Sequence, residues 1–104
     1  MTEVEYWKAV RTACAKVVVQ FRTLGVYQID PRPYEDSVGR PAVRFTVWLK
    51  DKPGDAQYEW TELSGIEREL TELLRDVDPD RSDYTAYAEY VLESETAERA
   101  AAVS

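Results

Sequence analysis

Four carboxylates within one segment are spaced so that they could share one flank of a helix and form a binding surface. They are Glu62, Glu69, Glu72 and Asp76. Steps of seven, three and four residues stack side chains along one flank of a helix, while Arg68 and Arg75 fall on the other flank. Such a ridge attracts a basic partner through a field that salt weakens. The alternative is an ordinary solvated helix face that keeps the protein soluble.

The negative charge of the whole chain is concentrated in its second half, which contains these four carboxylates. Residues 1–58 hold nine Lys/Arg and seven Asp/Glu, a net charge of +2, whereas residues 59–104 hold four and thirteen, a net charge of −9. The sum is the net charge of −7. This balance disfavours nucleic acid as a partner, because each phosphate contact needs a cation. A protein with a basic surface is the partner that the charge favours.

The residue types of the chain do not favour an enzyme. The chain has no His, so the commonest general acid–base group and every Ser-His or Cys-His pair are missing. Cys14 is the single Cys and lies on an apolar helix stripe, where it is expected to pack as a small hydrophobe. There is no glycine-rich phosphate loop. We therefore expect a non-catalytic protein without a cofactor, and a carboxylate-dependent enzyme is the less favoured alternative.

A metal site is not expected either. Asp76, Asp78, Asp80 and Asp83 offer oxygen ligands, but their spacing departs from a calcium loop and Pro79 interrupts it. One Cys and no His exclude a zinc cluster.

Two residues of a predicted strand form a second candidate interface. Strict alternation over Ala42–Lys50 places Val43, Phe45, Val47 and Leu49 on one face and Arg44 and Trp48 on the other. Trp and Arg are the commonest anchors of protein–protein contacts. Trp48 is expected either to be covered by another part of the chain or to lie in an interface, including a homodimer built sheet to sheet.

The elements before this strand are a helix and a short strand. Apolar residues from Val4 to Leu24 recur at steps of three and four, with Thr2 as the N-cap and Gly25 after the end. The run Val17–Val19 leaves open an earlier end near Lys16. A strand over Val26–Asp30 and a loop over Pro31–Pro41 follow.

The elements after it are less regular. We expect a turn over Asp51–Asp55, a hairpin strand over Gln57–Thr61 with Tyr58 and Trp60 inward, and a helix over Leu63–Val77. Tyr84–Glu93 reads as a strand, with a helix as the alternative, and Glu95–Val103 as a short terminal helix.

Together these elements predict one α+β domain over residues 1–104. The expected order is α-β-β-β-α-β-α, with a mainly antiparallel sheet of three or four strands and two helices on one face. In this order the chain resembles small acidic secretion chaperones and phage tail-completion subunits, a likeness of fold alone.

The function expected from the sequence is that of a small acidic protein-binding module, such as an adaptor, inhibitor, antitoxin-like or chaperone-like protein. The alternative is a structural subunit of a homo-oligomer or ring, in which the basic half of one copy meets the acidic half of the next. We expect a cytoplasmic location, because a lone Cys suits a reducing compartment and no apolar run is long enough to span a membrane.

Overall fold

The strand with the clearest alternation is the central strand of the sheet. In the computed structural model, which describes residues 1–54, 56–81 and 84–95, strand β2 spans Pro41–Leu49. Val43, Phe45 and Val47 are fully buried and Leu49 is 1% exposed, as the alternation predicted. The three strands lie in the order β1-β2-β3.

Strand β1 (Val26–Glu35) pairs with β2 in the antiparallel sense and forms a long hairpin with it. The predicted loop over Pro31–Pro41 is therefore wrong, since the pairing continues to Glu35 opposite Pro41. Proline lacks the N–H group that a central strand needs but is tolerated on an edge strand. Pro31 and Pro33 are two residues apart, so their missing donors both fall on the open edge of β1. The turn itself is Asp36–Arg40, where the Asp36 carboxylate accepts from the N–H groups of Val38 and Arg40.

Strand β3 (Thr85–Leu92) pairs with the other edge of β2 and runs parallel to it. The sheet is therefore mixed, and the expectation of a mainly antiparallel sheet is corrected. Parallel neighbours need a crossover connection, and helix α2 (Trp60–Val77) supplies it. The alternation that predicted Tyr84–Glu93 as a strand is confirmed, with Ala86, Ala88 and Tyr90 packed on the core.

The predicted strand over Gln57–Thr61 does not form. Residues 56–59 have no regular structure, and α2 already begins at Trp60, whose side chain is 61% exposed instead of inward. The described elements thus run α-β-β-α-β, with a 3-10 turn over Pro79–Arg81 before β3. Residues 93–95 begin another helical turn, and the rest of the predicted terminal helix lies outside the described residues.

Helix α1 (Glu3–Gln20) begins as predicted, with the Thr2 hydroxyl accepting from the Glu5 N–H at 3.1 Å. The Val17–Val19 run is helical, and the helix ends four residues before Leu24. Its buried stripe is Tyr6, Val10, Cys14 and Val17. Val4, which the predicted stripe included, is 76% exposed and does not belong to this buried stripe.

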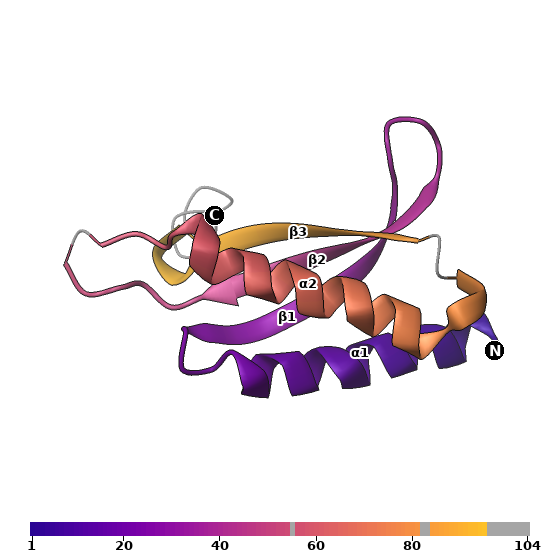
Figure 1. Cartoon of the computed structure of the whole chain (residues 1–104), viewed down its shortest axis with the longest axis horizontal. Helices are drawn as coiled ribbons and strands as arrows, with labels where there is room; N and C mark the ends of the chain where they lie inside the picture. The colour runs from indigo at the N-terminus through magenta and orange to yellow at the C-terminus, as the bar shows by residue number, and fades with distance from the viewer. Residues whose placement is uncertain (55, 82–83, 96–104) are drawn as a thin grey trace, which may run out of the picture.

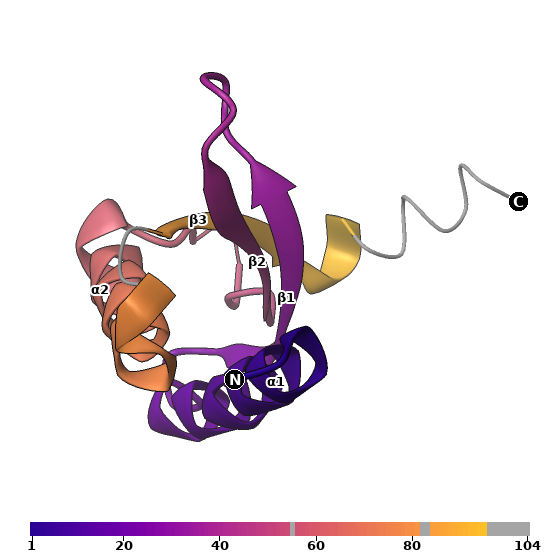
Figure 2. The ribbon, with the colours of Figure 1, turned by 90° about the vertical axis from the view of Figure 1, so that its right-hand side faces the viewer.

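Both long helices cover one face of the sheet (Figure 1), and the other face carries neither of them (Figure 2). Helix α1 packs against β1, α2 packs against β3, and the two helices contact each other. The expected α+β architecture with two helices on one face is confirmed. We call the helix-covered side of the sheet the inner face and the opposite side the outer face.

Candidate functional site

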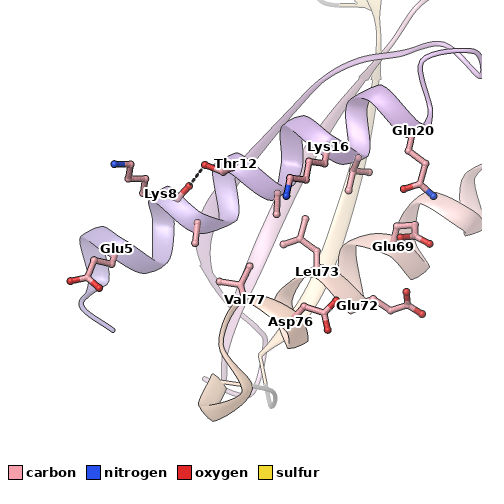
Figure 3. A pocket seen from close by; sticks show the side chains of 13 residues that line it. Glu5, Lys8, Thr12, Lys16, Gln20, Glu69, Glu72, Leu73, Asp76 and Val77 are labelled. Carbon is pink, nitrogen blue, oxygen red and sulfur yellow. Dashed lines mark hydrogen bonds between the residues drawn. The ribbon is translucent and has the colours of Figure 1, made fainter.

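A groove of about 700 Å³ runs along the surface between α1 and α2 (Figure 3). Its floor is apolar and comes from both helices, with Ala9, Ala13 and Val17 from α1 and Leu73 and Val77 from α2. From Glu5 to Gln20 the α1 wall has a length of about 22 Å at 1.5 Å per residue. The groove is therefore long enough for several turns of a helix.

The α2 wall of the groove carries three of the predicted acidic residues. Glu69, Glu72 and Asp76 line it together with Leu73 and Val77 (Figure 3). The sequence places them there because steps of three and four residues fall on one flank, and the neighbouring stripe of Ile66, Leu70, Leu73 and Leu74 is buried. None of the three forms an ion pair within the described part of the chain.

The α1 wall carries charges of both signs. Lys8 and Lys16 line it with Glu5, so the groove holds four carboxylates and two ammonium groups. Three of the four carboxylates lie on α2 and both ammonium groups lie on α1, which makes the groove electrostatically asymmetric. The sequence contains a signal for this wall, since Lys8, Thr12, Lys16 and Gln20 recur every four residues.

Glu62, the fourth predicted acidic residue, lies apart from the groove. Its carboxylate accepts from the Lys52 ammonium at 2.8 Å and from the backbone N–H of Glu59 at 2.9 Å. The hydrogen bond from Lys52, followed by that from Glu59, lowers the pKa of Glu62. This residue therefore closes the first turn of α2 and holds the preceding loop, and the acidic ridge is confined to three residues.

Arg44 and Trp48 both lie on β2 with side chains on the outer face, as predicted. Arg44 pairs with Glu89 of β3 at 3.3 Å and lies over the ring of Tyr34 of β1 at 5.7 Å. The rings of Tyr34 and Tyr87 meet edge to face at 5.4 Å. These contacts join all three strands. The sequence did not indicate that Tyr34 and Tyr87 meet, because the loop assignment hid the register of Tyr34.

Trp48 is half-buried. Val91, its partner in the parallel register, is only 1% exposed although it too lies on the outer face. The outer face is therefore partly covered at the Trp48 end and open at the Arg44 end, where Tyr34 and Tyr87 are 40% and 39% exposed.

The acidic loop after α2 is held by an arginine. Arg81 forms ion pairs with Glu3 at 2.6 Å and with Asp78 at 3.5 Å, and its guanidinium lies 4.3 Å from the ring centre of Tyr6. Within residues 1–54, 56–81 and 84–95, no three His, Cys, Asp or Glu side chains come together as metal ligands. Asp83, the fourth member of the predicted acidic loop, lies outside these residues.

Two buried groups resist ionisation. Burial raises the pKa of the Cys14 thiol to about 12, with a smaller contribution from the Asp30 carboxylate, and it raises the pKa of the Tyr6 hydroxyl to about 12. A thiol that stays protonated at neutral pH and is 2% exposed is a poor nucleophile, in accord with its packing role.

The comparisons give no relative from which a function could be transferred. No protein family, curated protein or solved structure matches this chain. Among the described helices, none combines the length and apolar character that crossing a membrane requires.

Proposed function

We propose that this protein is a small non-catalytic binding module, and that the groove between α1 and α2 takes an amphipathic helix of a partner protein. The observation that carries the proposal is the asymmetry of the groove, in which three carboxylates of α2 line one wall beside apolar residues of both helices. A fitting helix has an apolar face toward Leu73 and Val77 and a row of Lys or Arg toward Glu69, Glu72 and Asp76. Helices commonly bind their partners in grooves of this kind.

Electrostatics support a basic partner more strongly than an acidic or neutral one. None of the three carboxylates of the α2 wall forms an ion pair in the described part of the chain, so a cationic row can pair with them without breaking existing ion pairs. The net charge of −7 draws such a partner from a distance. We place the protein in the cytoplasm as part of the same proposal, since Cys14 is unpaired.

The proposal is tested with a defined peptide. The probe is an 18-residue helical peptide of Leu and Lys with one apolar and one cationic face, and binding is measured by calorimetry at two salt concentrations. The protein is expected to bind it, and the combined change Glu69→Gln, Glu72→Gln and Asp76→Asn is expected to weaken binding by about tenfold or more, because three charge pairs are lost.

A matched control carries the same change of charge elsewhere. Glu35→Gln, Asp80→Asn and Glu93→Gln alter three exposed carboxylates outside the groove. This control is expected to keep most of the affinity. Equal losses in the two variants would mean that only net charge matters and would refute the groove as the binding site.

A further inference from the structure

The outer face of the sheet carries its charges in two neighbouring rows. The strand register places Asp30, Thr46 and Glu89 side by side across β1, β2 and β3, and we call this set the acidic row. Two residues further along lies the basic row, which consists of Arg32, Arg44 and Tyr87. The rows are about 7 Å apart, since a strand rises about 3.4 Å per residue.

This face differs from the rest of the molecule in its charge balance. The two rows hold two carboxylates and two guanidinium groups, so they are neutral together, whereas the whole chain carries −7. A strongly basic partner is drawn to the α2 wall of the groove and finds no net attraction here. A second copy of the chain carries the same net charge of −7 and is repelled by the molecule as a whole. The neutral pair of rows on the outer face does not add to this repulsion.

The order of the rows makes the face complementary to itself. A two-fold axis that runs across the strands, between the rows, turns one sheet over onto another and exchanges the rows. Asp30 of each copy then lies over Arg32 of the other, and Glu89 lies over the Arg44–Tyr87 end of the basic row. A two-fold axis along the strands would instead place Asp30 over Glu89 and Arg44 over Arg44, which are repulsive contacts.

From this arrangement we infer that the outer face binds a second copy of the chain, sheet to sheet, about a two-fold axis that runs across the strands. Such an interface is isologous, because the same patch is used twice. Tyr34, Tyr87 and Arg44, which already contact each other and are partly exposed, supply residue types that anchor protein interfaces. The helices lie on the opposite face, so the α1–α2 groove stays open in the dimer.

Charge reversal tests the inference. Sedimentation equilibrium of the wild-type chain is expected to show a mass that rises with concentration from 12.0 kDa toward twice that value. Asp30→Arg places Arg over Arg32 of the other copy, and Arg32→Asp places Asp over Asp30 of the other copy. Each variant alone is expected to dimerise about tenfold or more weakly than the wild type.

Mixing the two variants is the decisive step. In a mixed pair, Arg at position 30 of one chain meets Asp at position 32 of the other, and Arg32 of the first chain meets Asp30 of the second. Equal amounts of Asp30→Arg and Arg32→Asp are therefore expected to restore the dimer. Circular dichroism checks that each variant is folded.

Control variants carry the same charge changes away from the outer face. Asp80→Arg and Arg75→Asp, at two exposed positions on and after α2, are expected to dimerise as the wild type does. A wild-type chain that stays at 12.0 kDa up to millimolar concentration, or a mixture that does not restore the dimer, would overturn the inference. Peptide binding in the groove is a separate readout, so the failure of one proposal leaves the other standing.

Discussion

Tyr6 is the largest of the fully buried side chains, although the helix stripe predicted from the sequence began at Val4 and did not include Tyr6. Its hydroxyl has no hydrogen-bond partner in the described part of the chain, while the Arg81 guanidinium covers its ring. A buried polar atom without a partner costs about 1–3 kcal/mol. The ring therefore stabilises the fold, and the hydroxyl opposes it.

Removal of this hydroxyl is expected to leave the fold as stable as before or more stable. For Tyr6→Phe we predict an increase of about 1 kcal/mol in the free energy of unfolding, measured by urea titration. Tyr90→Phe is the matched control, since the Tyr90 hydroxyl donates to the Leu63 carbonyl at 3.3 Å and its loss is expected to destabilise. A destabilised Tyr6→Phe variant would show that the hydroxyl does have a partner.

At the scale of elements, the start of α2 depends on one carboxylate. Glu62 accepts from the Glu59 N–H and from Lys52, so it ties the first turn to the preceding loop. Glu62→Gln keeps an acceptor for the N–H group and loses the ion pair, whereas Glu62→Ala loses both. We predict that the melting temperature falls in both variants and falls further in Glu62→Ala.

The dependence of the melting temperature on pH in the acid range is a second test of the contact between Glu62 and Lys52. Because the pKa of Glu62 is lowered in the folded state, its contribution is present above the ordinary value of 4.5 and is lost as the pH falls below it. The difference in melting temperature between the wild type and Glu62→Gln should therefore shrink toward pH 3. A difference that is the same at pH 7 and pH 3 would contradict the role of the ion pair.

Elements with a strong local pattern were predictable, and those set by distant contacts were not. The alternation of β2 and the helical stripe of α2 survive in the structure because each pattern is read within one element. Pro31 and Pro33 indicated a loop, but their place on an edge strand removes the conflict. The direction of β3 depends on how the chain returns after α2, which no local pattern records.

The same limit applies to the candidate site. Periodicity predicted that Glu69, Glu72 and Asp76 share a flank, and they do. It also grouped Glu62 with them, since a repeat says nothing of the Lys52 side chain that pairs with this residue. The acidic and basic rows of the outer face follow from strand register, which becomes visible only once the sheet is assembled.

At the scale of the whole molecule, buried acids of high pKa make the fold sensitive to alkali. In the folded state the pKa of Cys14 rises from 9.0 to about 12 and that of Tyr6 from 10.0 to about 12, and burial raises that of Tyr90 as well. The unfolded chain therefore releases these protons first as the pH rises. The contribution that these protonated groups make to stability is complete below about pH 9 and is lost as the pH rises toward 12.

Urea titrations between pH 8 and pH 11 check this prediction. The midpoint of unfolding is expected to hold up to about pH 9 and to fall from there to pH 11. In Cys14→Ala the fall is expected to begin about one pH unit later, because the thiol no longer contributes. A midpoint that stays constant to pH 11 would contradict the burial of these groups.

The parallel pairing of β3 has a consequence for how the chain folds during synthesis. Partners in the hairpin of β1 and β2 are close in sequence, but Ala42 must wait for Thr85, which emerges 43 residues later. Ribosomes add about 5–20 residues per second, so one edge of an apolar strand stays unpaired for on the order of seconds. During that interval the nascent chain exposes a template for aggregation, and a chaperone that shields β2 is expected to raise the yield of folded protein.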